Sequence, residues 1–247
     1  MARSTQVTDY AEFLQTLDNK GKSYFLEGGQ AVNFWAEYYS HKSNLDSKLG
    51  HLRPFTSKDC DIWVSHAALK YLESDTERGS LKKEASPVDG QIAIYTIKGN
   101  PPLEVNLMGG VYGIPEKMNE KLSQRALNFN GLRVLDPPHL LRSKCHCLVE
   151  LDQTDRQDQK HLSMLVPILA EYVTELIEQA SNGKLSERAV LAELKILLKI
   201  NKDRRIKDGL AKIGSNAIDL FPVKALKSDN LPLVSQFTQM TLVKELS

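Results

Sequence analysis

Three carboxylates are spaced so that they could hold a divalent cation together. Asp59 and Asp61 lie two residues apart in Asp59-Cys60-Asp61-Ile62-Trp63-Val64, so on a strand both would project from one face of the sheet. Glu104 lies in Leu103-Glu104-Val105-Asn106-Leu107, whose strict alternation puts Glu104 and Asn106 on the face opposite the apolar residues. Convergent acids suit Mg²⁺ when phosphate and water complete its coordination. Taken alone, an Asp-x-Asp pair is also typical of a solvated loop.

A pair of glycines, Gly28 and Gly29, separates a short apolar strand at 24–26 from a helical pattern that begins at Ala31. Glycines let the backbone approach a ligand closely, and the free amides at a helix N-terminus attract anions, so this turn could hold a triphosphate. Most glycine pairs are simply turns. Neither the P-loop pattern nor the Gly-x-Gly-x-x-Gly dinucleotide turn occurs in the chain, and the kinase and Rossmann interpretations therefore lose their main support.

Hydrophobic spacing predicts the elements that must position these residues. The polar, irregular residues 41–55 predict a loop or insertion, and Asp136-Pro137-Pro138 predicts the start of a helix. The pattern becomes entirely helical near residue 150, which predicts two domains, 1–150 and 151–247. The expected elements before that point are helices over 9–17 and 66–73 and strands over 24–26, 59–64, 91–97, 103–107, 126–129 and 132–135.

Composition places the chain among globular proteins. Its 247 residues are 41% hydrophobic and 26% charged, with a formal net charge of +1, so the overall charge does not indicate a nucleic-acid binder. No apolar run approaches the roughly 18 residues that cross a bilayer, and we expect a cytoplasmic protein without a membrane partner. Seven Lys and Arg against two Asp over 195–212 form a local basic segment, which is either a solvated face or an RNA contact.

The three cysteines do not form a disulfide framework, and they suit a reducing compartment. Cys60, between the two acids, should point to the opposite, apolar face of its strand. Cys145-His146-Cys147 does not predict a zinc site, because residues i and i+2 diverge by about 200° on a helix. His161 is expected to be a surface or core-edge histidine.

The order of these motifs resembles that of the DNA polymerase β-like nucleotidyltransferase superfamily. The resemblance lies in Gly28-Gly29, then Thr56-Ser57-Lys58-Asp59-Cys60-Asp61, then Leu103-Glu104-Val105. Within that superfamily, Gly28-Gly29-Gln30-Ala31-Val32-Asn33-Phe34-Trp35 looks most like the bacterial nucleotidyltransferase-like proteins of the abortive-infection, type IV toxin–antitoxin group. Leu140-Leu141-Arg142-Ser143-Lys144 and Arg156-Gln157-Asp158-Gln159-Lys160 resemble later motifs of that group.

The resemblance implies an α/β (α+β) nucleotidyltransferase fold with a mixed sheet, followed by an all-helical C-terminal domain. It also implies an NTP and Mg²⁺ bound between the two domains. The implied catalytic and metal-binding residues are Asp59, Asp61 and Glu104. The implied nucleotide-binding residues are Gly28, Gly29, Ser57, Lys144 and Asp158, with Asp158 positioning either Lys144 or the nucleotide.

The implied reaction moves a nucleoside monophosphate from an NTP to a hydroxyl on a tRNA 3′ end, a protein or a small molecule. A toxin-type member would have an antitoxin protein as partner. Two alternatives stay open. One is a non-catalytic interaction protein that keeps the fold and binds a partner such as an antitoxin, and the other is metal-dependent phosphodiester hydrolysis with the same acids.

Overall fold

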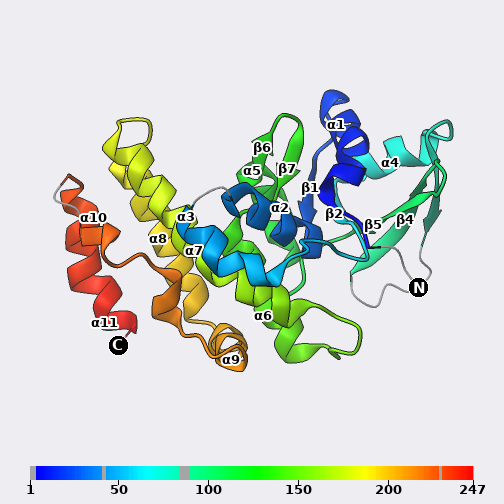
Figure 1. Cartoon of the computed structure of the whole chain (residues 1–247). Coiled ribbons are helices and arrows are strands. Elements are labelled where there is room, and N and C mark those ends of the chain that lie inside the picture. The colour runs from blue at the N-terminus through cyan, green and yellow to red at the C-terminus, as the bar shows by residue number, and fades with distance from the viewer. Residues whose placement is uncertain (1–3, 41–42, 84–89, 228–229, 247) are drawn as a thin grey trace. The chain divides into compact units, whose positions relative to one another are not determined.

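The computed structural model describes residues 4–40, 43–83, 90–227 and 230–246 (Figure 1). The chain folds into two compact units. The first unit comprises residues 1–38 and 52–143, and the second comprises residues 39–51 and 144–247. The predicted boundary at 150 differs from this division, in which a short early segment of the chain belongs with the C-terminal helices.

A seven-stranded mixed sheet with the strand order β3-β4-β5-β2-β1-β7-β6 forms the first unit. Strand β2 runs parallel to β5, β1 runs parallel to β7, and the other neighbours are antiparallel. The strands are β1 (Tyr24–Glu27), β2 (Asp61–Val64), β3 (Gly79–Lys83), β4 (Gln91–Ile97), β5 (Leu103–Met108), β6 (Leu127–Phe129) and β7 (Leu132–Val134). The predicted mixed sheet and the α/β class are confirmed.

Helices α1, α2, α4 and α5 accompany the sheet, and α6 begins directly after its last strand (Figure 1). Asp136 accepts a hydrogen bond from the backbone N–H of His139 at 3.0 Å, which confirms the predicted helix start after Asp136. The bounds are α1 (Ala11–Asn19), α2 (Gly28–Ser40), α4 (His66–Ser74), α5 (Asn119–Arg125) and α6 (Pro137–Glu150), with 3-10 turns η1 (Val7–Tyr10) and η3 (Glu116–Met118).

Residues 144–246 of the second unit contain only helices where the structure describes them, and α7 contacts α3, α8 and η4. Leu165, Ile168 and Leu169 of α7 are fully buried, as is Leu194 of α8. The elements are α3 (Ser43–Leu49), α7 (Asp158–Ser181), α8 (Glu187–Asn201), α9 (Arg204–Lys212), α10 (Pro232–Phe237), α11 (Val243–Leu246), η2 (Gly50–Leu52), η4 (Ala217–Leu220), η5 (Ala225–Lys227) and η6 (Thr238–Leu242).

Several elements differ from the sequence prediction. Where the structure describes it, the segment 41–55 is not a loop, because α3 and η2 lie within it and bury Leu45 and Leu49. Strand β2 begins at Asp61, so Asp59 and Cys60 precede the strand. Strand β3 and helix α5 were not predicted.

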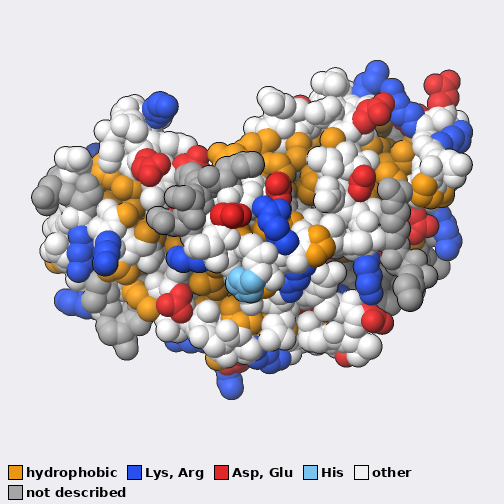
Figure 2. Space-filling model, in the orientation of Figure 1, with side chains coloured by type: hydrophobic (Ala, Val, Ile, Leu, Met, Phe, Trp, Pro, Cys, Tyr) orange, Lys and Arg blue, Asp and Glu red, His pale blue; other side chains and the backbone are white. Residues whose placement is uncertain are grey.

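None of the described helices is both long enough and apolar enough to span a bilayer. On the face drawn in Figure 2, basic and acidic side chains are interspersed and do not gather by sign. This distribution agrees with the formal net charge of +1.

Candidate functional site

The glycine turn and the second aspartate meet where β1 ends and β2 begins, in the middle of the sheet. Gly28 begins α2 directly after β1 and has a φ of +65°, a left-handed conformation that favours glycine. A Cβ at Gly28 would overlap Oδ2 of Asp61 and would lie 3.0 Å from its Cγ. The Asp61 carboxylate therefore occupies the space that a side chain at position 28 would need.

The register of the strands defines which side chains surround Asp61. Glu27 pairs with Asp61 across β1 and β2, and Asp61 pairs with Asn106 across β2 and β5. Directly opposed residues share a face of the sheet, and the stacked rings of Phe25 and Trp63, 5.1 Å apart, mark the same face two residues further in. Glu27, Asp61 and Asn106 therefore lie side by side in one row across β1, β2 and β5.

Asn106, and not Glu104, lies directly opposite Asp61. Its Nδ2 donates a hydrogen bond to Asp61 Oδ1 at 3.0 Å, so the nearest side chain on β5 is a neutral amide. Glu104 is exposed two residues earlier on the same face and pairs with Thr96 of β4. Within the described part of the chain, Glu104 has no hydrogen-bond or ion-pair partner, which leaves its carboxylate accessible.

Asp59 is exposed, and its neighbour Cys60 is fully buried, so the two side chains point in different directions, as predicted. The backbone N–H of Asn106 donates to the Cys60 carbonyl at 2.8 Å, which continues the pairing of β2 and β5 beyond the start of β2. Burial raises the pKa of the Cys60 thiol well above its ordinary value, and the charges of Asp61 and Asp59 raise it further. Cys60 is therefore an uncharged core residue.

Among the described residues, no three His, Cys, Asp or Glu side chains are close enough together to hold a metal ion. Asp59, Asp61 and Glu104 thus do not form a preassembled three-ligand centre. Their donor atoms are nevertheless all oxygen, as Mg²⁺ prefers, and Mg²⁺ at nucleotide sites needs only one or two carboxylates beside phosphate and water. The donor chemistry therefore fits a magnesium ion that arrives with a nucleotide.

The loop that carries Ser57 is fixed to the first turn of α2 by the N-terminal segment. Ser57 and Thr5 exchange backbone hydrogen bonds of 2.9 and 3.1 Å, and Gln30 Nε2 donates to the Thr5 carbonyl and hydroxyl, each at 3.0 Å. Tyr10 donates its hydroxyl proton to Thr5 Oγ1 at 3.1 Å, and burial raises the pKa of Tyr10 to about 12. This network holds Ser57 near the glycine turn, two residues before Asp59.

Lys144 and Asp158 form a buried ion pair in the second unit. Lys144 Nζ lies 2.8 Å from Asp158 Oδ1, with side-chain exposures of 8% and 2%, and Arg156 Nε lies 2.6 Å from Asp158 Oδ2. Burial by itself would raise the pKa of Asp158, but Lys144 and Arg156 outweigh it, so that the pKa lies below its ordinary value. The predicted contact of Asp158 with Lys144 is present, and their role toward a nucleotide stays a prediction.

His161 is buried beside this ion pair, not at the surface, with 3% of its area exposed. Burial and the charge of Lys144 lower the pKa of His161 well below its ordinary value, so the ring is neutral. Neither ring nitrogen has a hydrogen-bond partner within the described residues.

Three of the seven cations in the basic segment 195–212 lie beside carboxylates. Arg205 lies 2.9 Å from Glu150, Arg204 lies 3.5 Å from Asp208 and Lys202 lies 3.0 Å from Glu245. The side chains of all three are exposed, and an RNA contact of the segment stays a prediction.

Glu27 and Asn106, which lie on either side of Asp61, were not among the predicted site residues. The alternation of residues 103–107 placed Asn106 on the same face as Glu104, but alternation does not say which residue lies opposite Asp61. Glu27 follows three apolar residues and directly precedes the glycine pair, and it is only 4% exposed. A charged residue at the buried end of a short strand was the signal that could have identified it.

The similarity of this chain to known proteins is slight. No family model matches the chain, and no curated protein matches it. Among solved structures, it is similar to an antigenic nucleotidyltransferase-like protein from Paracoccidioides brasiliensis, with 16% identity over 70% of this chain and 89% of that chain, and a TM-score of 0.39. A TM-score this low does not establish a common fold.

Proposed function

We propose that this chain is a Mg²⁺-dependent nucleotidyltransferase that moves a nucleoside monophosphate from an NTP to a hydroxyl acceptor. The observation that carries the proposal is the contact of Gly28 with the Asp61 carboxylate. In this contact the N-terminus of α2, whose amides could bind an anion, lies beside a carboxylate that could bind a metal ion, where β1 ends and β2 begins.

In this proposal the amides at the start of α2, made accessible by Gly28 and Gly29, bind the triphosphate. Asp59 and Asp61 hold the magnesium ion, which supplies positive charge beside the phosphate oxygens. Asn106 and Gly28 fix the orientation of the Asp61 carboxylate. Ser57, which the Thr5 bridge holds in place, is a hydroxyl donor toward the nucleotide.

Glu104 is the proposed general base. Its exposed carboxylate accepts the proton of the acceptor hydroxyl, the hydroxyl oxygen forms a bond to the α-phosphorus, and the bond from that phosphorus to the pyrophosphate oxygen breaks. Pyrophosphate leaves with the electron pair. A role of Lys144 toward the triphosphate rests on the sequence resemblance. Within the second unit, Asp158 positions the Lys144 ammonium group through the 2.8 Å ion pair.

The proposed acceptors are a tRNA 3′ end, a protein or a small molecule. A toxin-type role with an antitoxin partner also belongs to this proposal. It rests on the sequence resemblance alone.

Incubation with each α-labelled NTP, Mg²⁺ and either total tRNA or cell lysate tests the reaction. We expect label in one acceptor class with release of pyrophosphate, and loss of transfer in Asp61→Asn. The exposed carboxylate of Asp208, substituted as Asp208→Asn, is the control and should keep transfer. Labelled NMP without labelled acceptor would indicate hydrolysis of the NTP in place of transfer, and shortening of the added tRNA would indicate phosphodiester hydrolysis.

A non-catalytic interaction protein is the second candidate. The neutral Asn106 opposite Asp61 favours it, because the acid expected at that place is not there. Absence of transfer together with absence of Mg²⁺-dependent NTP binding would reject the enzyme and leave this candidate. Gain of transfer in Asn106→Asp would show that the amide limits the site.

A further inference from the structure

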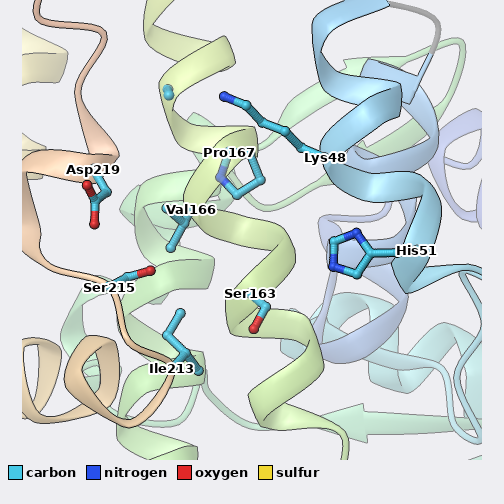
Figure 3. A pocket seen from close by; sticks show the side chains of 9 residues that line it. Lys48, His51, Ser163, Val166, Pro167, Ile213, Ser215 and Asp219 are labelled. Atoms are coloured by element: carbon cyan, nitrogen blue, oxygen red, sulfur yellow. The ribbon is translucent and has the colours of Figure 1, made fainter.

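A cavity of about 460 Å³ lies within the second unit, and none of its lining residues belongs to the proposed nucleotide site. Its volume falls in the range of roughly 300–1,000 Å³ that is typical of ligand sites. Helix α7 forms its floor, α3 and η2 form one wall, and the segment from Ile213 to Asp219 forms the other (Figure 3).

One wall is basic. Lys48 and His51 extend from α3 and η2 toward α7 (Figure 3). In the part of the chain that the structure describes, neither side chain has a hydrogen-bond or ion-pair partner. An anionic group is the complement of this wall.

The opposite wall is acidic. Asp219 lines the cavity (Figure 3), and its Oδ2 accepts a hydrogen bond from the backbone N–H of Asn216 at 2.9 Å. Ser215, whose backbone N–H donates to the Leu210 carbonyl at 3.0 Å, presents its hydroxyl to the same space. A cationic or hydrogen-bond-donating group is the complement of this wall.

The floor is apolar. Val166, Pro167 and Ala170 line it, and Ile213 adds apolar surface from the acidic wall. This surface suits apolar side chains of a ligand.

We propose that this cavity binds a short peptide with apolar side chains, its carboxylate at Lys48 and His51 and its ammonium group at Asp219. The two charged walls stand on opposite sides of α7, and a helix with its side chains is about 10–12 Å wide. A single amino acid carries both charges on one carbon and is too short. An extended chain covers about 3.3–3.6 Å per residue, so two or three residues match the span.

Isothermal titration of the full chain with the tripeptide Leu-Ala-Leu, its N-acetyl form and its C-terminal amide tests this proposal. We expect saturable binding of the free tripeptide and about fivefold weaker binding of each blocked form, because each lacks one exposed ion pair. No saturable binding, or equal binding of all three peptides, would overturn the proposal without any variant being needed.

Two variants locate the charges. Lys48→Met should weaken binding of the free and N-acetyl peptides about fivefold and leave the amide unchanged, and Asp219→Asn should weaken the free and amide peptides and leave the N-acetyl form unchanged. Lys199→Met, a substitution outside the cavity, is the control and should leave all three unchanged. An equal loss for all three peptides in Lys48→Met would mean that the lysine does not contact the carboxylate.

Discussion

At the scale of single residues, Gly28 combines two constraints that can be separated experimentally. Its φ of +65° disfavours any side chain, and the Asp61 carboxylate fills the space beside it. Gly183 has a similar φ of +70°, but no neighbouring atom lies within 4 Å of the place that a Cβ would take there. The pair therefore distinguishes backbone strain from steric contact.

We expect Gly183→Ala to lower the free energy of unfolding by about 1–2 kcal/mol, the cost of a left-handed alanine. Gly28→Ala should cost about 1–3 kcal/mol more, because the new methyl group must displace Asp61. Urea unfolding of both variants measures the difference. Equal losses would mean that Asp61 moves aside freely, and the contact would then lose its importance for the site.

The Lys144–Asp158 pair predicts a large effect of removing one partner. Asp158→Asn should lower the free energy of unfolding by about 3–5 kcal/mol, because it removes the charge of Asp158 from beside the buried Lys144 ammonium group. The double variant Lys144→Met/Asp158→Leu should recover most of that loss. Urea unfolding of the two variants gives the comparison, and a mild effect of Asp158→Asn would indicate that Lys144 reaches water.

The Lys144–Asp158 pair also predicts that the free energy of unfolding depends on pH in the acidic range. The pKa of Asp158 is lower in the folded than in the unfolded chain, so its contribution is present above the ordinary Asp pKa of about 3.9 and is lost as the pH falls through the lower folded value. Unfolding free energies measured from about pH 6 down to about pH 2 should therefore fall below about pH 4. The double variant should fall less steeply, and the remaining slope comes from the other carboxyl groups with lowered pKa values, among them Asp136, Glu150 and Asp152.

At the scale of elements, the unpredicted parts share weak apolar patterning. Strand β3 is Gly79-Ser80-Leu81-Lys82-Lys83, an edge strand whose side chains are mostly exposed, and lysines are typical of edges that must not pair further. Helix α5 buries a single apolar side chain, Leu122. Strands β1 and β2 are buried on both faces and are therefore rich in apolar residues, and this composition made them predictable.

Strand register explains why the site was only partly predictable. The types and order of Gly28, Asp59 and Asp61 were sufficient to predict that a glycine turn and an acid meet. Whether Glu104 or Asn106 lies opposite Asp61 depends on a shift of two residues in the pairing of β2 and β5, and both alternatives keep the same face. The cavity in the second unit was not predictable at all, since its walls come from separate segments of the chain.

Helix α9 approaches α6 closely at a glycine. A Cβ at Gly209 would lie 3.0 Å from the Cβ and Sγ atoms of Cys145 and 3.1 Å from its Cα. Gly209→Ala gains about 1 kcal/mol of helix propensity but forces the helices apart at a cost of about 1–3 kcal/mol, so we expect a net loss of thermal stability. The loss should shrink in a Cys145→Ala background, which removes the Sγ contact, and an unchanged loss would assign the clash to the Cα and Cβ atoms that alanine retains.

At the scale of the whole molecule, the thiols report the integrity of both units at once. Cys60 belongs to the first unit, and Cys145 and Cys147 belong to the second. All three are buried thiols outside any disulfide. Burial raises the pKa of Cys60 and of Cys145 far above the ordinary range, which suppresses the reactive thiolate.

We expect a thiol reagent such as dithionitrobenzoate to label none of the three cysteines rapidly in the native protein. All three should react in urea. Rapid reaction of one native thiol would show which unit opens first, once the labelled residue is identified by peptide mapping. A native chain with all three thiols reactive would contradict their burial.

The assignment of residues 39–51 to the second unit has a consequence for how the chain is made. Leu45 and Leu49 leave the ribosome long before α7 is synthesised, although they are 3% and 0% exposed in the finished fold. Because synthesis runs from the N-terminus, the nascent chain carries these two leucines without their partners on α7 while residues 52–143 of the first unit emerge. A gene fragment that starts at Lys144 would never encode it, and its product would lack the basic wall of the cavity.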